Sequence, residues 1–481
     1  MFESGNLKSD SLEAVIGLEV HLAVKTRSKM FCACRADGFG SEPNSNTCPV
    51  CLGLPGSLPV ANHTAIDKAL MFSLALHCRV PERTQFHRKN YFYPDAPKNY
   101  QISQFDRPLG EHGYLELADG RRIGVTRCHL EEDAGRSVHP PYADYSLVDL
   151  NRAGAPLVEM VTEPDLRTPE EAREFLGRVR AIAQALGASD ASPEEGKMRA
   201  DVNVSVRRPG EPLGTKVEVK NLNSFKSVQS ALAFEIKRQT MLLEEGRAVT
   251  QQTRGWNEGG QKTYLMREKE GSSDYRYFAD PDLPPITISS EWLERIRAAT
   301  PELPDSKRER YLAAGVRTFD ADLVAYDVDL SRFFDEALRG GGEPQAVANW
   351  LNGDVTGYLR SRGEALGDSP LTPQLLVHLV RLVEKGEISG KTAKDLLPEV
   401  MAGADPGRLV EERGLNLIAD VGQIERLIDS VLDSHDSIVQ SVGDNPKAIN
   451  ALLGLVMKES RGKAMPDLVR RLLNEKLGVP G

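Results

Sequence analysis

The sequence lacks long apolar runs: none of its 481 residues belongs to a stretch approaching the ~18 residues of a membrane-spanning helix. Its first residues also lack the apolar core of a secretion signal, so we expect a cytoplasmic protein without a membrane partner. A basic excess is absent too, because the formal net charge is −10, which argues against a protein that coats nucleic acid over its whole surface. Only six cysteines are present, and in a reducing compartment closely spaced cysteines favour metal binding over disulfides.

Two common catalytic signatures are also missing. The segment GEISGKT at 386–392 has three residues between its first glycine and the Gly-Lys-Thr triplet, whereas a Walker A loop has about four. We therefore predict a joint between two helices there, with Ser389 as the N-cap of the second. The sequence contains no serine-rich amidase signature and no Cys-His arrangement of the kind that hydrolyses glutamine.

The most informative stretch that is present runs from Arg127 to Asp165. It gathers Glu131 and Glu132 near its start, and Glu159 interrupts the apolar run PLVEMV further on. A carboxylate in an apolar run is unfavourable unless a cation compensates its charge. Because Mg²⁺ prefers carboxylate oxygens, the stretch predicts half of a metal and phosphoryl-transfer site.

Residues 13–24 predict a strand in which Glu19 and His21, two positions apart, share one face. Two interpretations remain open for this pair. The side chains either complete a polar cavity with Glu159 or form the solvated face of an edge strand.

Four cysteines form two close pairs, Cys32 with Cys34 and Cys48 with Cys51. Two pairs on short loops can occupy the four vertices of a tetrahedral Zn²⁺ site, whereas the alternatives are strained local disulfides or free thiols. Sulfur would fill all four positions and leave none for substrate, so we predict a structural zinc site.

Four lysines are candidates for contacts with nucleotide phosphates. Lys89 and Lys98 stand among aromatic residues between 87 and 106, a mixture that suits a phosphate with a base or sugar but is also compatible with a loop of packed tyrosines. The alternating runs 199–207 and 215–221 predict an antiparallel hairpin, whose polar face holds Lys216 and Lys220.

The coarse pattern predicts an α+β protein: an N-terminal domain with an antiparallel or mixed sheet over residues 1–290, followed by two all-helical domains over 291–407 and 408–481. Within the helical part we expect single helices over 319–338 and 344–363. The last domain ends in a basic helical unit that contrasts with the acidic whole chain, which makes it a candidate for nucleic-acid contact or an ordinary solvated face.

Several long strings resemble one family over nearly the whole chain. They are IGLEVH at 16–21, KNYFYPDAPKNYQISQFD at 89–106, HLEEDAGRSVH at 129–139, DLNRAGAPLVEMVTEPD at 149–165 and MRADVNVSVR at 198–207. These strings resemble the B subunits of the tRNA-dependent Asp/Glu-tRNA(Asn/Gln) amidotransferases. The resemblance implies a catalytic cradle domain, a helical domain and a tail that binds tRNA.

The resemblance also implies a reaction and its partners. ATP would phosphorylate the side-chain carboxylate of misacylated Glu-tRNA(Gln) or Asp-tRNA(Asn), and ammonia would then displace the phosphate. The ammonia would come through a channel from a glutaminase A subunit, held in a heterotrimer by a small C subunit. The non-discriminating synthetase is a further expected partner. The alternative hypothesis is a zinc-bearing scaffold that binds tRNA without catalysis.

By resemblance, the catalytic and Mg²⁺-binding positions are Glu19, His21, Glu159 and one of Glu131 or Glu132. Adjacent residues of a strand point to opposite faces, so only one of the two neighbouring glutamates is expected to ligate directly, and we favour Glu132. The four cysteines match the zinc-bearing members of the family.

Overall fold

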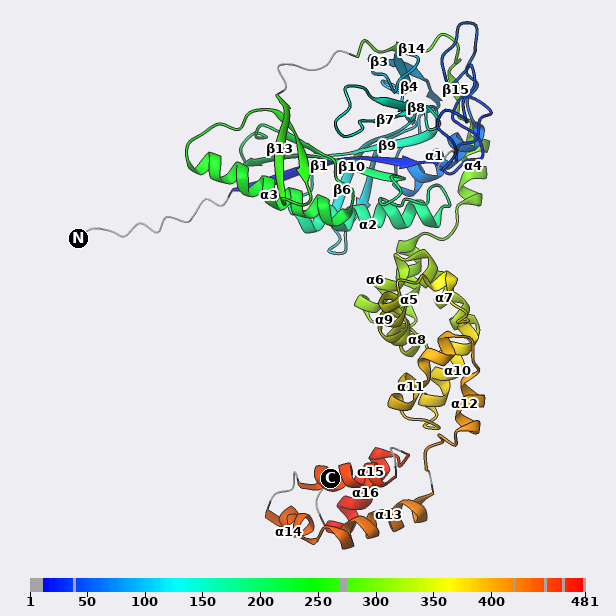
Figure 1. Ribbon diagram of the computed structural model, residues 1–481, viewed down its shortest axis with the longest axis vertical. Helices are drawn as coiled ribbons and strands as arrows, with labels where there is room; N and C mark the ends of the chain where they lie inside the picture. Colours follow the sequence, from blue (N-terminus) through cyan, green and yellow to red (C-terminus); the bar gives the residue numbers. More distant parts are fainter. Residues whose placement is uncertain are drawn as a thin grey trace, which may run out of the picture. The chain divides into compact units, whose positions relative to one another are not determined.

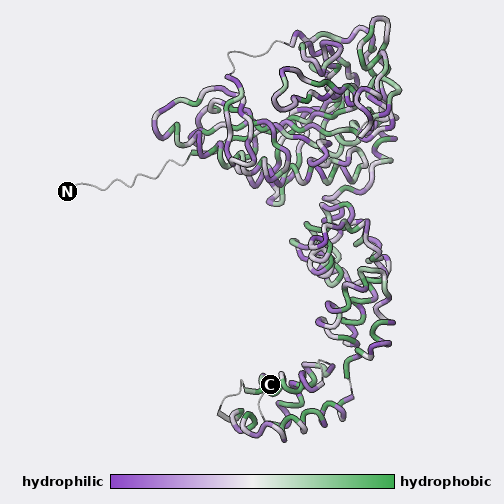
Figure 2. Tube along the Cα trace, viewed as in Figure 1, coloured by the Kyte–Doolittle hydropathy of each residue, from purple (hydrophilic) through white to green (hydrophobic). Residues whose placement is uncertain are grey.

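The computed structural model describes residues 12–37, 40–268, 275–418, 420–444, 448–460 and 463–478 (Figure 1). The chain divides into two compact units at the junction of Pro304 and Asp305, and each is described by itself. Figure 2 shows short hydrophobic stretches that alternate with hydrophilic ones along both. Within the described ranges, no helix is both long enough and apolar enough to cross a membrane.

An eight-stranded sheet is the centre of the first unit. Its order is β13 (Lys262–Glu268), β12 (Gln252–Asn257), β11 (Val217–Lys220), β10 (Met198–Arg207), β1 (Glu13–Ala23), β9 (Pro156–Thr162), β6 (Arg122–Glu132) and β5 (Gly110–Glu116). Neighbours are antiparallel except β11 and β12, which are parallel, so the sheet is mixed. The predicted strand at 13–24 and the predicted hairpin are both confirmed.

Three helices that precede residue 290 contribute to the hydrophobic core of the sheet. They are α1 (His63–Ala75), α2 (Pro169–Ala185) and α3 (Phe225–Glu244), and Figure 1 shows α2 and α3 along one side of the sheet. Side chains alternate along a strand, so one face of β10 and β11 presents Val202, Val204, Val217 and Val219 to the core. The residues between them are polar and point to the other face, where the predicted site residues Glu19, His21 and Glu159 also lie.

Short strands lie on that other side, opposite α2 and α3 (Figure 1). β3 (His87–Asn90) pairs with β4 (Tyr100–Ser103) and with β14 (Phe278–Ala279). β7 (Arg136–Val138) and β8 (Leu147–Asp149) form a hairpin, and β2 (Arg83–Thr84) pairs with β15 (Ile286–Thr287). These segments bring the 87–106 and 127–165 stretches to the polar face.

The helix α4 (Ser290–Ala299) belongs to the first unit, because its Ile296 is buried in the same core as the sheet. The sequence-based boundary at residue 290 therefore precedes a helix that packs with the first unit. The division into three domains stays a prediction.

All named elements in the described residues of the second unit are helices or helical turns, which together with the mixed sheet confirms the α+β class. Its elements are α5 (Pro304–Ala313), α6 (Thr318–Ala325), α7 (Val328–Arg339), α8 (Pro344–Trp350), the π-helical turn η1 (Leu351–Val355), α9 (Thr356–Arg362), the 3₁₀ turn η2 (Leu366–Asp368), α10 (Pro373–Glu384), α11 (Gly390–Met401), α12 (Pro406–Glu412), α13 (Val421–Ser434), α14 (Asp436–Asp444), α15 (Ile449–Glu459) and α16 (Pro466–Leu477). Buried residues form one core between Tyr311 and Val410 and another between Ile424 and Leu473.

Two details of the helical part test the sequence-based predictions. Ser389 accepts a hydrogen bond from the backbone of Thr392 and caps α11, as predicted for the segment 386–392 that lacks the Walker A spacing. The single helix expected over 319–338 is wrong: α6 and α7 are separate, because the Asp327 side chain accepts the amides of Asp329 and Leu330 and starts a new helix.

Phe175 provides a test of the helix-to-sheet core, because it is fully buried on α2. We expect Phe175→Ala to lower the free energy of unfolding of the first unit by about 3–5 kcal/mol, through lost burial and a residual cavity. Arg173→Ala, on the exposed side of the same helix, should change it by less than about 0.5 kcal/mol. Urea denaturation followed by circular dichroism measures both, and equal effects would contradict the assigned core.

Candidate functional site

The polar face of the sheet concentrates charge on three neighbouring strands. The register of β9 places Glu159 directly opposite His21 of β1 on one side and His129 of β6 on the other. Val158 and Met160, which flank Glu159 in the sequence, are buried in the core on the opposite face of the sheet. Glu159 is therefore fixed between two imidazoles by strand pairing alone.

Two more carboxylates complete the cluster. His21 Nε2 lies 3.4 Å from Glu159 Oε2, 3.6 Å from Glu131 Oε1 and 3.8 Å from Glu19 Oε1. His129 Nε2 lies 3.5 Å from the same Glu159 oxygen and 3.7 Å from Glu131 Oε2. Two groups of possible metal ligands result, Glu19 with His21 and Glu159, and His129 with Glu131 and Glu159, each with its ligand atoms within 4.8 Å of one another.

Burial makes the charges of this cluster depend on one another. It opposes ionisation of Glu159, yet the charge of His129 and the hydrogen bond with His21 hold the pKa of Glu159 well below its usual range. Burial also favours neutral His21, but the hydrogen bond with Glu159 and the charge of Glu131 raise the pKa of His21 to about 9. The pKa of Glu19 is raised, first by burial and then by the charge of Glu159. The cluster thus needs positive charge, and the raised pKa of His21 means that this imidazole can supply part of it.

The donor set fits a divalent cation. Each of the two groups joins carboxylate oxygens and an imidazole nitrogen from two paired strands within 4.8 Å, as a hard or borderline metal ion requires, and Glu159 belongs to both. In the described part of the chain, the buried Nδ1 of His129 has no hydrogen-bond partner.

The structure corrects the preference for Glu132 over Glu131. Glu131 contacts His21 and accepts a hydrogen bond from Ser103 Oγ at 3.3 Å. Glu132 points to the other side of β6, where it forms an ion pair with Lys98 and accepts the amide of Ile102 at 2.9 Å. The alternation argument was sound, but it could not say which of the two neighbours faces His21, because that depends on how β6 pairs with β9.

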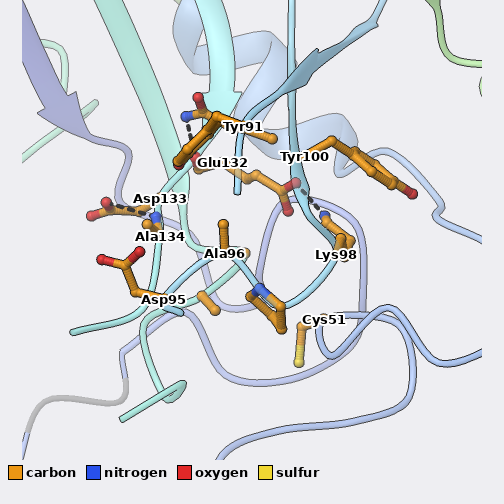
Figure 3. Close-up of a pocket in the computed structure, with 13 residues that line it drawn as sticks. Cys51, Tyr91, Asp95, Ala96, Lys98, Tyr100, Glu132, Asp133 and Ala134 are labelled. Atoms are coloured by element: carbon orange, nitrogen blue, oxygen red, sulfur yellow. Dashed lines mark hydrogen bonds and ion pairs between the residues drawn. The ribbon is translucent and has the colours of Figure 1, made fainter. Parts of the chain in front are cut away.

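The Lys98–Glu132 pair lines a small pocket beside the cluster (Figure 3). Tyr91, Asp95 and Asp133 are labelled around it, and Cys51 lies at its edge. The aliphatic chain of Lys98 also packs on Gly53, where a Cβ atom would lie 2.4 Å from Lys98 Cγ. The cysteine-bearing loop therefore contacts one of the predicted phosphate ligands.

The other three candidate lysines lie in different surroundings. Lys89 Nζ lies 5.0 Å from the centre of the Tyr275 ring, and although burial opposes its charge, Glu131 raises its pKa above the usual value. Lys220 forms an ion pair with Asp201 and lies 3.1 Å from Glu218 on the polar face. Lys216 is exposed and precedes β11, so the structure does not bring it to the cluster.

His129 is a cluster member that was not among the predicted site residues. Its sequence signal was its position two residues before Glu131, which places both on one face of a strand. Arg127 continues that face, with its guanidinium 3.9 Å from Glu159 Oε1. Asp133 lies to one side, where it pairs with Arg199 and Arg152.

The four predicted zinc ligands do come together. Their sulfur atoms all lie within 4.8 Å of one another, and Cys51 Sγ is 3.8 Å from Cys48 Sγ. Cys51 accepts the backbone amide of Cys48 at 3.1 Å, and the hydrogen bond from Cys32 lowers the pKa of Cys51 to about 4. This geometry and the thiolate character of Cys51 fit a zinc ion. Cys78 and Cys128 lie elsewhere, buried in the core.

Comparison with known proteins places this chain in a family. Residues 14–294 match the family model described as the GatB/GatE catalytic domain, and residues 332–477 match the GatB domain. The B subunit of the aspartyl/glutamyl-tRNA(Asn/Gln) amidotransferase from Thermus thermophilus is 59% identical over 469 residues, 97% of this chain and 99% of that protein. The protein of the same name from Deinococcus radiodurans is 56% identical over 476 residues, with the same coverage.

These matches confirm the predicted family and the predicted class of enzyme, an amidotransferase-type carbon–nitrogen ligase. The chain belongs to the family of aspartyl/glutamyl-tRNA(Asn/Gln) amidotransferase B subunits.

Proposed function

We propose that this chain uses ATP to convert misacylated Glu-tRNA(Gln), Asp-tRNA(Asn) or both into Gln-tRNA(Gln) and Asn-tRNA(Asn). The γ-phosphoryl group of ATP moves to the side-chain carboxylate of the aminoacyl ester, and ADP leaves. Ammonia then attacks the activated carbonyl carbon, the C–O bond to phosphate breaks, and an amide and inorganic phosphate form. The names of the relatives, which specify an aspartyl/glutamyl-tRNA(Asn/Gln) amidotransferase, support this substrate class.

The observation that carries the proposal is the buried carboxylate of Glu159 between His21 and His129. A protein that only presents tRNA to another enzyme has no use for three buried or half-buried carboxylates that converge on two imidazoles. Phosphorylation of a carboxylate, by contrast, brings several negative charges together and needs a cation to neutralise them. The cluster therefore favours the catalytic hypothesis over the scaffold hypothesis.

Glu19, His21, Glu131, Glu159 and the newly recognised His129 would hold Mg²⁺. When bound, Mg²⁺ supplies charge neutralisation and alignment of the phosphate oxygens. Lys89, whose charge interacts with that of Glu131, would contact the transferring phosphoryl group, and Lys220 lies on the same face of the sheet. The pair of Glu132 and Lys98 lies outside the ligand set and lines the neighbouring pocket.

Ammonia requires a partner, because the sequence has no amidase or glutaminase signature. We infer a heterotrimer with a glutaminase A subunit, which delivers ammonia through a channel, and a small C subunit. The word "subunit" in the names of the relatives supports an assembly of this kind. The non-discriminating synthetase that makes the misacylated tRNA is the expected supplier of substrate.

We divide the chain into a catalytic cradle domain, a helical domain and a helical tail that begins at residue 408. The tail is our candidate for tRNA binding. It has its own hydrophobic core between Ile424 and Leu473, and Lys458 and Arg470 are exposed on it. Exposed basic side chains on a compact helical body suit contacts with phosphates.

The catalytic assignment predicts a loss of activation without a loss of structure. Glu159→Gln keeps the shape but removes the charge, and His21→Ala removes a ligand. Each should slow ATP hydrolysis that depends on Glu-tRNA(Gln) by at least about 100-fold, because the transition-state charge loses its stabilisation. Single-turnover assays in the reconstituted heterotrimer measure this rate. His139→Ala, on the exposed β7–β8 hairpin, is the matched control. Normal rates in both site variants would favour the scaffold hypothesis.

The tail assignment predicts a separation of two activities. Deletion of residues 416–481, which keeps α12 and the core that ends at Val410, should weaken tRNA binding about tenfold or more through lost phosphate contacts, while the partner continues to hydrolyse glutamine at the normal rate. A Lys458→Gln, Arg470→Gln double variant of the full chain should give a smaller loss and a shallower salt dependence. Filter-binding assays at several salt concentrations measure both, and unchanged affinity in the truncation would remove the assignment.

The zinc assignment predicts that Cys48→Ser lowers metal content and stability together. Three thiolates hold zinc less tightly than four, and the loop that the metal closes then becomes unstable. Mass spectrometry of the metal content and thermal unfolding check this, with Ser41→Ala in the same segment as the control. The assignment would be refuted if adding zinc to metal-free wild-type protein left its unfolding temperature unchanged.

A further inference from the structure

Lys29 is one of the largest side chains of the first unit to be fully buried. Its ammonium nitrogen donates a hydrogen bond to the backbone carbonyl of Asn46 at 2.8 Å and lies 3.7 Å from Cys51 Sγ. In the part of the chain that the structure describes, no carboxylate forms an ion pair with it. No pattern in the sequence singles out this lysine.

A buried ammonium without a negative partner is strongly unfavourable. A backbone carbonyl supplies a dipole but no charge. The sulfur of Cys51 is the group in contact that can carry a negative charge, and four thiolates around one Zn²⁺ retain a net charge of about −2. The negative charge of the proposed zinc centre therefore compensates the buried ammonium, and the ammonium balances part of that negative charge.

The position of Lys29 in the chain strengthens this pairing. Its backbone amide donates to the carbonyl of Cys34 at 2.8 Å, so the main chain is tied to the first cysteine pair. Its side chain reaches Asn46 and Cys51, which belong to the segment of the second pair. One residue thus holds both halves of the cluster at the separation that a tetrahedral ion requires.

Neighbouring residues hold the ammonium in this orientation. Asn151 Oδ1 accepts the backbone amide of Asn46 at 2.8 Å and so fixes the peptide segment whose carbonyl Lys29 contacts. Gly154 borders the lysine stem: a Cβ atom there would be in ordinary van der Waals contact with Lys29 Cδ at 3.5 Å and with Cys51 Cβ at 3.4 Å. The side chain is packed along its length and has a single direction in which to point.

We propose that Lys29 is a positioning residue of the four-cysteine zinc centre: it balances part of the negative charge of the centre and donates an N–H to the Cys51 sulfur. The inference rests on the zinc site put forward under the proposed function and adds a residue outside the ligand set. Partners of this kind around metal ligands commonly change metal affinity by about 10- to 100-fold.

The test compares Lys29→Met with Lys25→Met in the full-length protein. Methionine keeps most of the buried stem but removes the charge and the N–H donors, whereas Lys25 forms an exposed ion pair with Asp190 at 2.7 Å. Zinc release to a chromogenic chelator is measured at equal temperature and pH. We expect Lys29→Met to release zinc about 10- to 100-fold faster than wild type, and Lys25→Met to match wild type.

A second readout separates charge balance from packing. Wild type and Lys29→Met are each unfolded thermally with zinc bound and after zinc removal. Because the ammonium interacts most strongly with the metal-bound thiolates, the substitution should reduce the stabilisation that zinc confers. An equal loss of stability in both forms, with unchanged zinc release, would show a packing role and overturn the proposal.

A labelling experiment on the wild-type protein covers the case in which the variant does not fold. An amine-reactive reagent should modify Lys25 at all times and Lys29 only after zinc removal, as read by peptide mass spectrometry. Persistent protection of Lys29 without zinc would overturn the proposal. The zinc site itself would be overturned if wild-type protein contained no zinc and Cys48→Ser left its stability unchanged. That outcome differs from a protein that binds zinc but releases it at the same rate with and without Lys29, which would overturn the role of Lys29 alone.

Discussion

The carboxylate of Glu159 lies in the middle of a sheet, with a paired strand on either side of β9 and almost no access to water. A negative charge in that place requires nearby positive charge, and the required partners cannot come from β9 itself, because its neighbours on both sides are apolar. They come from β1 and β6, as His21 and His129. The pairing register of three strands and the ionisation of one side chain are thus parts of the same constraint.

The two faces of the sheet serve different purposes, one stability and the other chemistry. Valines and other apolar side chains of β1, β9 and β10 join the helices in one core, which fixes the backbone that carries the polar residues of the opposite face. A sheet with its strands paired on both sides moves little, so ligand atoms from distant parts of the sequence keep their separations. Such rigidity suits the proposed metal and phosphoryl-transfer site, which would have to hold its charges in place before the reaction.

The cysteine loop stands next to this site rather than apart from it. Gly53 packs against Lys98, and Gly154 lies between Cys51, Lys29 and Glu132. Folding of the loop around its four sulfurs therefore helps to set the position of the Lys98–Glu132 pair. The proposed zinc centre would influence the proposed reaction in this way, without contact with the substrate.

The sequence alone was enough to determine the family, the α+β class, the strand at 13–24, the hairpin of runs 199–207 and 215–221 and the grouping of four cysteines. The family follows from the long strings that resemble it, whereas the other features depend on alternation, capping residues and close spacing. The same patterns could not determine that Glu131 rather than Glu132 joins the cluster, that His129 faces Glu159, or that Lys98 pairs with Glu132 and Lys216 stays at the surface. Those outcomes depend on the register of β6 against β9 and on which loop packs beside it. Lys29 shows the same limit, because an isolated lysine has no signal in a sequence until the tertiary structure buries it beside a sulfur.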